Sequence, residues 1–334
     1  MFQKNKSLRS LNTFGIDATA ELFAEVTSLE ELKEIVGQYK ELFILSGGSN
    51  ILLTQNIKEP VIYLNTKGIE LIEKNLETVL VKVQAGENWH EFVCWCLKND
   101  FGGLENLSLI PGNVGTSPMQ NIGAYGVEIK DCFESLEALE ISSGDIQTFK
   151  AKDCAFGYRE SVFKNTLKGQ FIILNVTFRL TAKDHKINAD YGAIKDQLRK
   201  NKVSNPGIND ISNAVIAIRQ SKLPDPNKIG NSGSFFKNPV ISLTHFEKLQ
   251  KRNPRMPYYR LSDKLIKVPA GWLVEKCGLK GKRIGDAGVH DKQALVLVNH
   301  DHAKGTDILT LAKTVQQTVS DEFDIDLEME VNII

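Results

Sequence analysis

The segment that organises the chain reads I-P-G-N-V-G-T-S-P-M-Q-N-I-G-A-Y-G and runs from Ile110 to Gly126. It is rich in glycine, and residues 106–127 carry no charged side chain, although 25% of the chain is charged. Glycine permits positive φ angles and close approach of backbone N–H groups to a ligand, and such groups bind anions without a lysine. Proline stiffens the loop. The segment suits a large cofactor with a pyrophosphate and a polar ring, although glycine density alone fits an ordinary turn between strands slightly better.

A second glycine-rich segment follows an apolar stretch near the N-terminus. Leu42–Leu45 reads as a buried strand, and Ser46, Gly47, Gly48, Ser49 and Asn50 come directly after it. A dinucleotide fingerprint G-x-G-x-x-G and a Walker G-K-[ST] are both absent from this position. On its own the segment fits a phosphate loop and a plain tight turn equally well.

The composition limits the classes of protein to consider. The 334 residues are enough for two or three domains, and 42% hydrophobic content indicates a soluble globular protein. A formal net charge of zero argues against nucleic acid as the main partner. No apolar run approaches membrane-spanning length, and the N-terminus has no signal-peptide pattern. Five cysteines without C-x-x-C spacing fit reduced thiols in a cytoplasmic protein.

Hydrophobic periodicity predicts a mixed α/β fold whose second half is richer in loops. Strands are expected at 20–26, 42–45, 61–65, 69–72, 79–83, 136–141, 146–149, 171–180, 294–298 and 327–331. Helices are expected after a capping box at Ser28, after Asn88, from Tyr191-Gly192, near residue 245 and over 306–322, with Arg219 following a helix. The histidine-containing segment 299–302 reads as a polar turn, and no metal site is predicted.

Three side chains could carry chemistry, although each also has an ordinary structural interpretation. Ser234 lies between Gly233 and two phenylalanines and has no triad pattern, so it fits either a turn serine or a hydroxyl that protonates a carbanion. Arg159 suits a bidentate grip on a carboxylate, or a salt bridge. Glu330 lies on the polar face of an expected strand, and the ordinary interpretation is that this face is solvated. Lysines 222, 237 and 280 could bind phosphate, although most lysines are merely exposed.

Taken together and in order, these segments resemble the family of UDP-N-acetylenolpyruvoylglucosamine reductases, flavoenzymes of cell-wall precursor synthesis. The resemblance spans nearly the whole chain, and its most specific motifs are Q-N-I-G-A-Y-G and G-S-F-F-K-N-P. The matching segments are 12–15, 46–50, 103–115, 120–128, 156–163, 233–239, 270–275, 279–281, 289–299 and 327–331. Tyr191-Gly192 and residues 184–230 resemble the longer subtype, in which a tyrosine loop closes over the substrate.

The resemblance implies an α/β (α+β) fold with a two-lobed FAD-binding domain of the vanillyl-alcohol-oxidase type and an α+β substrate-binding domain. Residues 1–66, joined by a C-terminal strand at 324–334, would form the first lobe and residues 67–183 the second. Residues 184–323 would form the substrate-binding domain. A cytoplasmic, monomeric enzyme is expected, with small-molecule substrates and without nucleic acid or membrane insertion.

The reaction implied is the NADPH-dependent, FAD-mediated reduction of an enolpyruvyl ether of UDP-N-acetylglucosamine to UDP-N-acetylmuramate, as in a UDP-N-acetylmuramate dehydrogenase. Ser234 matches the proton donor, and Arg159 and Glu330 match the pair that stabilises the enol intermediate. A protonated Glu330 would donate a hydrogen bond to the enolate; this is a hypothesis.

The binding residues are also implied by the resemblance. For the substrate they are Tyr191, Arg219, Lys222, Asn238, Lys280 and Gln293. For FAD they are Ser46, Gly47, Gly48, Ser49, Asn50, Ile110, Pro111, Gly112, Gly115, Gln120, Asn121, Ile122, Gly123, Ala124 and Tyr125. Ser46 stands where the family usually has glycine, which predicts altered packing at the flavin. Two alternatives stay open: a related FAD-dependent oxidase that uses oxygen, and a nucleotide-binding protein without catalysis.

Overall fold

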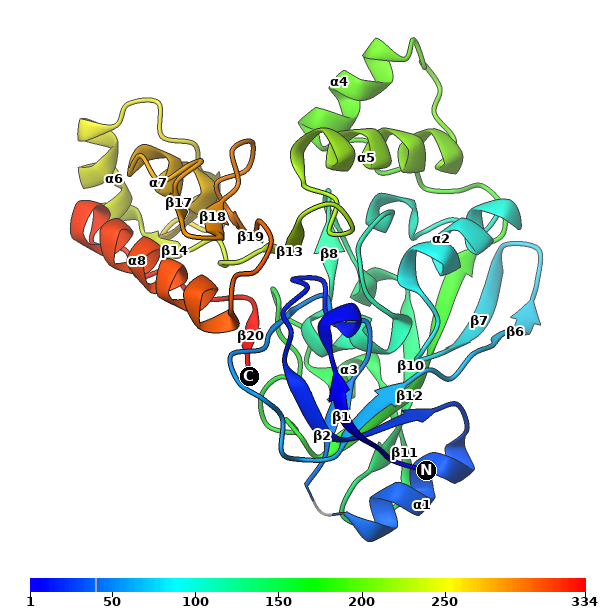
Figure 1. The fold of residues 1–334 in the computed structure, drawn as a ribbon. Coiled ribbons are helices and arrows are strands. Elements are labelled where there is room, and N and C mark those ends of the chain that lie inside the picture. The colour runs from blue at the N-terminus through cyan, green and yellow to red at the C-terminus, as the bar shows by residue number, and fades with distance from the viewer. Residues whose placement is uncertain (40) are drawn as a thin grey trace. The chain divides into compact units, whose positions relative to one another are not determined.

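The computed structural model describes residues 1–39 and 41–334, which separate into two compact units (Figure 1). The first unit comprises residues 1–6, 20–47 and 57–221. The second unit comprises residues 7–19, 48–56 and 222–334. The chain therefore crosses between the units several times, and the S-G-G-S-N segment divides at Gly47 and Gly48.

The first unit contains a four-stranded sheet of order β1-β2-β5-β3, in which β5 is parallel to both β2 and β3. The helix α1 (Leu29–Gln38) begins at Ser28, whose side chain accepts a hydrogen bond from the Glu31 amide. Leu32 and Val36 on this helix join the buried cluster that includes Ile62 on β5. The strands are β1 (Gln3–Ser7), β2 (Thr19–Val26), β3 (Phe43–Leu45) and β5 (Val61–Leu64).

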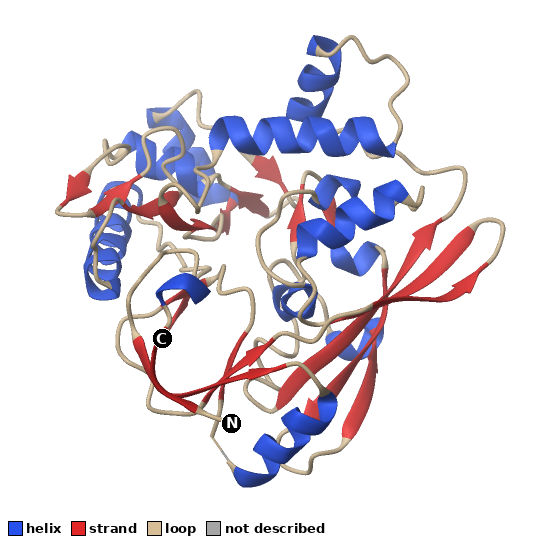
Figure 2. Ribbon diagram, turned by 45° about the vertical axis from the view of Figure 1, so that its right-hand side comes forward, coloured by secondary structure: helices blue, strands red, loops and turns tan. Residues whose placement is uncertain are grey.

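A larger antiparallel sheet of order β11-β10-β12-β7-β6 forms the rest of the first unit's framework (Figure 2). Alternating burial along β7, with Val79, Val81 and Val83 inside, shows that one face of the sheet is packed. The helix α2 (Trp89–Lys98) contributes Trp89 and Phe92 to the same cluster. The strands are β6 (Ile69–Lys74), β7 (Thr78–Gln84), β10 (Phe133–Glu140), β11 (Ile146–Lys150) and β12 (Phe171–Thr181).

Smaller elements complete the first unit. Helices α4 (Gly192–Lys200) and α5 (Ile208–Lys222) form their own cluster, with Ile194, Ile211 and Val215 inside. The short elements are 3₁₀ helices η2 (Glu105–Leu107), η3 (Val114–Gln120) and η4 (Ile129–Asp131), strands β8 (Gly123–Ala124) and β9 (Val127–Glu128), and helix α3 (Ala151–Cys154).

The second unit has a four-stranded sheet of order β13-β19-β18-β17, a three-stranded sheet of order β14-β16-β15, and the parallel pair β20-β4. The long helix α8 buries Ile308, Leu311 and Val315 on one stripe. The strands are β4 (Ile51–Leu52), β13 (Gly230–Ser234), β14 (Val240–Ser242), β15 (Tyr259–Arg260), β16 (Leu265–Lys267), β17 (Arg283–Ile284), β18 (Ala287–Val289), β19 (Val296–Asn299) and β20 (Asn332–Ile333). The helices are η1 (Arg9–Leu11), α6 (Leu243–Arg252), α7 (Ala270–Lys276) and α8 (Gly305–Phe323).

Most predicted elements are confirmed to within a few residues, and two predictions are wrong. Residues 327–331 do not form the predicted strand; Met329 makes an isolated bridge to Phe236, and the final strand is β20. Arg219 does not follow a helix but lies inside α5. No helix in residues 1–39 and 41–334 is long and apolar enough to span a membrane.

Candidate functional site

The glycine-rich loop, residues 110–126, adopts a strained backbone in the first unit. Asn121 and Tyr125 have φ angles of 46° and 52°, and Leu109, the residue just before the loop, has a φ angle of 60°. Non-glycine residues in this region cost about 1–3 kcal/mol each and persist where their surroundings hold them, often at functional sites. Ile110, Ile122 and Ala124 pack against the core cluster, whereas Pro111 is exposed and Gln120 partly buried. The loop is thus anchored by its apolar side chains.

Backbone contacts fasten the start of this loop to the segment before α2. The Gly115 amide donates to the Ala85 carbonyl at 2.9 Å, and a Cβ added at Gly115 would lie 2.5 Å from the Ala85 Cβ. The Trp89 indole donates to the Leu107 carbonyl at 2.9 Å. Glycine at 115 is therefore required for close packing and not only for flexibility.

Asn121 holds the other end of the loop. Its side chain is buried, and it donates to the Glu128 carboxylate at 2.9 Å and to the Gly157 carbonyl at 3.1 Å. Its side-chain oxygen accepts from the Lys130 amide at 3.1 Å. Because both the amide nitrogen and the amide oxygen of Asn121 are hydrogen-bonded, this side chain holds the end of the loop in its conformation.

Arg159 reaches the same loop from the segment after α3. Its Nη2 donates to the Gly123 carbonyl at 2.8 Å, and its own φ is 58°. The guanidinium also lies 5.3 Å from the centre of the Tyr158 ring. The structure therefore places the predicted catalytic arginine on the glycine-rich loop and holds it in a strained conformation.

The residues expected to hold FAD in the first unit fit a bound ligand. A Cβ added at Gly47 would lie 2.5 Å from the Gly112 Cα, so the two glycine-rich segments meet backbone to backbone. The Ser46 hydroxyl is buried and has no hydrogen-bond partner among the described residues. A buried polar atom without a partner costs free energy unless a ligand or water satisfies it. Close glycine contact and an unsatisfied hydroxyl are both consistent with a cofactor cradle.

Tyr125 links two other residues expected to bind ligands, Tyr191 and Arg219 of α5, in the first unit. The rings of Tyr125 and Tyr191 lie 5.3 Å apart, edge to face. Burial lowers the pKa of Arg219, and the neighbouring Tyr125 hydroxyl partly offsets this effect. The Arg219 Nε is buried without a partner among the described residues. This cationic, aromatic cluster can take an anionic or polar ligand.

Ser234 and Glu330 are neighbours in the second unit. Ser234 ends β13, opposite Val296. The Glu330 amide donates to the carbonyl of Phe235, the residue after Ser234, at 2.9 Å. The Asn50 side chain donates to the Glu330 carbonyl at 3.2 Å. Three segments that are far apart in sequence thus meet at one place, and Glu330 is partly buried rather than on a solvated strand face.

Three of the predicted substrate residues of the second unit, Asn238, Gln293 and Lys280, lie near α7, and Lys222 does not. The Asn238 side chain accepts from the Ala270 amide at 2.9 Å, and the Gln293 Oε1 lies 3.0 Å from where a Cβ at Gly271 would be. Lys280 pairs with Glu275 on α7 at 2.9 Å. Lys222 is exposed at the end of α5. Arg159 belongs to the first unit, so the structure does not gather the three predicted catalytic residues within one unit.

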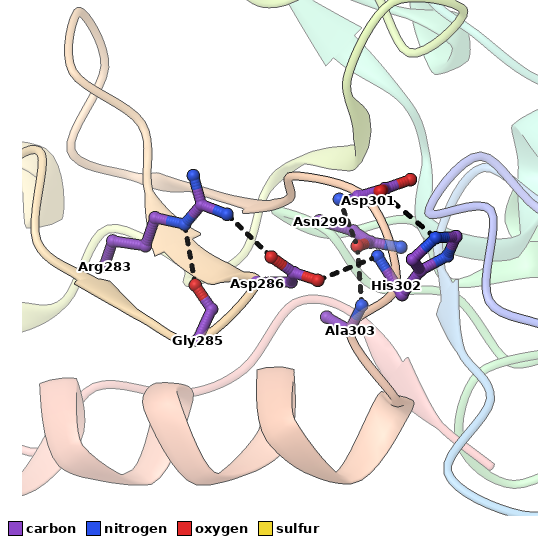
Figure 3. Close-up of polar contacts among 7 residues, drawn as sticks. All are labelled: Arg283, Gly285, Asp286, Asn299, Asp301, His302 and Ala303. Atoms are coloured by element: carbon purple, nitrogen blue, oxygen red, sulfur yellow. Dashed lines mark hydrogen bonds and ion pairs between the residues drawn. The ribbon is translucent and has the colours of Figure 1, made fainter.

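The segment 299–302 is a polar turn after β19, as predicted (Figure 3). The Asn299 side chain accepts from the amides of Asp301 and Ala303 at 3.1 and 3.0 Å. Asp286 accepts from the His302 amide at 3.2 Å and pairs with Arg283 at 2.6 Å. These hydrogen bonds and this ion pair indicate that the polar side chains stabilise the turn.

Sequence reasoning missed His90, whose ring nitrogen accepts from the Leu109 amide at 3.0 Å just before the glycine-rich loop. The only sign of this role in the sequence was that His90 stands at the start of α2, two residues after the capping Asn88. The contact itself joins residues 19 positions apart, so no local pattern shows it.

Known proteins match this chain over nearly its whole length. A family model described as "UDP-N-acetylenolpyruvoylglucosamine reductase, C-terminal domain" matches residues 225–334, and one described as "FAD binding domain" matches residues 20–150. The UDP-N-acetylenolpyruvoylglucosamine reductase of Flavobacterium johnsoniae is 56% identical over 99% of both chains. That of Amoebophilus asiaticus is 47% identical over 99% of both, and that of Pseudomonas syringae pv. tomato is 44% identical over 99% of this chain and 98% of its own.

A solved structure has the same fold. The UDP-N-acetylenolpyruvylglucosamine reductase from Thermus caldophilus superposes with a TM-score of 0.70 and 24% identity, covering 100% of this chain and 99% of its own. The mixed α/β fold with an FAD-binding domain is therefore confirmed.

Proposed function

Because the chain belongs to the UDP-N-acetylenolpyruvoylglucosamine reductase family, we propose that it reduces the enolpyruvyl ether of UDP-N-acetylglucosamine to UDP-N-acetylmuramate with electrons from NADPH. The family and the FAD-binding domain make the chain an FAD-dependent oxidoreductase.

FAD would be held by residues 46–50 and by the glycine-rich loop. Gly47 and Gly112 allow the two segments to approach each other, and the Ser46 hydroxyl is available to a ligand. A bound FAD would supply the redox chemistry that links hydride from NADPH to reduction of the substrate alkene. The loop has no charged side chain, so backbone N–H groups would carry the anionic part of the cofactor.

We assign the protonation of the substrate, and the stabilisation of the negative charge that develops on it, to three side chains. Ser234 gives a proton to the carbon next to the carboxylate after hydride adds to the terminal alkene carbon. Arg159 stabilises the negative charge that develops on the carboxylate, and protonated Glu330 donates to the same enolate. The observation that carries most weight is the hydrogen bond from the Glu330 amide to the Phe235 carbonyl, which brings the backbone at Glu330 beside the end of β13, where Ser234 lies.

The anionic UDP group would meet the cations and aromatic rings already described. Arg219 has a buried Nε without a partner among the described residues, Tyr125 lies beside it, and the Tyr191 ring packs against Tyr125 in the first unit. The remaining substrate contacts that we propose are Lys222, Asn238, Lys280 and Gln293. We further propose a three-part division into residues 1–66 with 324–334, 67–183 and 184–323, and a monomer that works in the cytoplasm.

An anaerobic stopped-flow experiment tests the proposal. The enzyme is reduced with NADPH, and the enolpyruvyl ether is then mixed in while flavin absorbance is followed. We expect rapid reoxidation together with formation of UDP-N-acetylmuramate. A reduced flavin that reacts with oxygen but not with this substrate would point instead to an oxidase, and a colourless protein that binds no FAD would point to a role without catalysis.

A further inference from the structure

One histidine connects α2 to the residue just before the glycine-rich loop. His90 is the second residue of α2, and its Nδ1 accepts a hydrogen bond from the Leu109 amide at 3.0 Å. Leu109 has a φ of 60°, which a leucine adopts only when its surroundings hold it. His90 is therefore part of what maintains the entry to the loop.

The hydrogen bond defines the protonation state of the imidazole. A backbone amide can only donate, so Nδ1 must carry a lone pair and the ring hydrogen must be on Nε2. The Cys94 Sγ lies 3.7 Å from Nε2 and can accept that hydrogen. A protonated imidazole carries hydrogen on both nitrogens, so protonation would remove the acceptor that Leu109 uses.

The groups around His90 keep it neutral. Burial lowers the pKa of His90, the charge of Arg219 on α5 lowers it further, and Glu91 on α2 opposes them. Burial raises the pKa of the Cys94 thiol, so this neighbour is also neutral near pH 7. The only charges that face the ring are thus those of Arg219 and Glu91 among the described residues.

We propose that neutral His90 is a positioning residue that holds Leu109, and with it the start of residues 110–126, in the conformation that binds FAD. Protonation of His90 breaks the bond to Leu109 and weakens FAD binding. This inference rests on the proposed role of the loop as the FAD cradle. His90 acts through Leu109.

The first test needs no cofactor. Hydrogen exchange of the Leu109 amide is measured in apoprotein near neutral pH for wild type, His90→Ala and His90→Asn. Asparagine places a non-titrating acceptor close to the position of Nδ1, so it should preserve slow exchange, whereas alanine should accelerate it. Equal exchange in wild type and His90→Ala would overturn the proposal, whatever the loop binds.

The second test measures the FAD dissociation constant from flavin fluorescence between about pH 5 and 8, the range in which histidines titrate. We expect wild-type affinity to fall as the pH falls. His90→Asn should retain the neutral-pH affinity and lose the pH dependence, and His90→Ala should bind about 2- to 10-fold more weakly at neutral pH.

The matched control is His185→Asn, because His185 bonds Thr181 and Asp100 instead. This control should keep the wild-type pH profile. If His90→Asn also keeps it, the pH switch is refuted even though FAD binds. If no variant binds FAD at any pH, the proposed function fails, while Leu109 exchange still reports on His90.

Discussion

The glycine-rich loop and the pair formed by Ser234 and Glu330 solve different physical problems. The loop depends on backbone: glycines packed against Gly47 and Ala85, left-handed residues, and amides with assigned partners. The pair depends on the functional groups of two side chains whose backbone segments are joined by the hydrogen bond from the Glu330 amide to Phe235. The loop should therefore be sensitive to the gain of a Cβ at its packed glycines, whereas the pair should be sensitive to the loss of its side-chain groups. Substitutions in the two regions should separate cofactor binding from turnover.

Removing the Ser234 hydroxyl should have the largest effect. Ser234→Ala should lower turnover with the enolpyruvyl substrate by about 10²–10⁴-fold, as expected for loss of a general acid. FAD affinity and the rate of flavin reduction by NADPH should change little. Stopped-flow measurement of both half-reactions checks this.

Ser10→Ala is the control for the loss of a serine hydroxyl. Ser10 is exposed in η1 of the same unit, so removal of its hydroxyl should leave turnover near the wild-type rate. Equal losses in the two half-reactions of Ser234→Ala would contradict the proton-donor role.

A Cβ at the junction of the two glycine-rich segments should come next. Gly47→Ala places a methyl group 2.5 Å from the Gly112 Cα, and such overpacking costs about 1–3 kcal/mol. We expect weaker FAD binding, measured by equilibrium dialysis, and a lower midpoint of thermal unfolding. In Gly37→Ala, where nothing lies within 4 Å in α1, stability should rise by about 0.4–1 kcal/mol. Unchanged FAD affinity in Gly47→Ala would show that the contact between Gly47 and Gly112 is not part of the FAD-binding site.

Loss of the tie at Asn121 should have a comparable or smaller effect. Asn121→Ala removes the acceptor of Lys130 and the donor to Glu128 and Gly157 inside the core. A buried group left without its partner costs about 1–3 kcal/mol, measured as the free energy of unfolding in urea. The exposed Asn201→Ala should stay within about 0.5 kcal/mol of wild type. A loss confined to turnover would contradict a purely structural role for Asn121.

The smallest effect should come from the sheet that supports the loop. A hydrogen bond from Lys82, and then one from Asn175, lowers the pKa of Glu137. A depressed carboxyl pKa adds stability that is present above the unfolded-state pKa and is lost as the pH falls through the folded-state value. Glu137→Gln should lower the unfolding midpoint slightly at neutral pH, and the difference should shrink in acid. A constant difference at all pH values would exclude the ion pair as its cause.

Local patterns were enough to predict most of the fold. The capping serine of α1, the capping asparagine of α2 and the alternating valines of β7 act through neighbours along the chain, so the sequence shows them directly. The strand predicted at 327–331 failed because strand formation needs a partner: β4 pairs with residues 332–333, and no local pattern specifies that choice.

By itself the sequence determined the elements, the glycine-rich loop and the family motifs, because these depend on residue type and local spacing. Only the tertiary structure decided that Arg159 donates to Gly123, that the Glu330 amide meets Phe235 next to Ser234, and that His90 holds Leu109. Each of these contacts joins segments that lie far apart along the chain. Their hydrogen bonds exist only once sheets and helices pack, and packing depends on the whole chain rather than on any one segment.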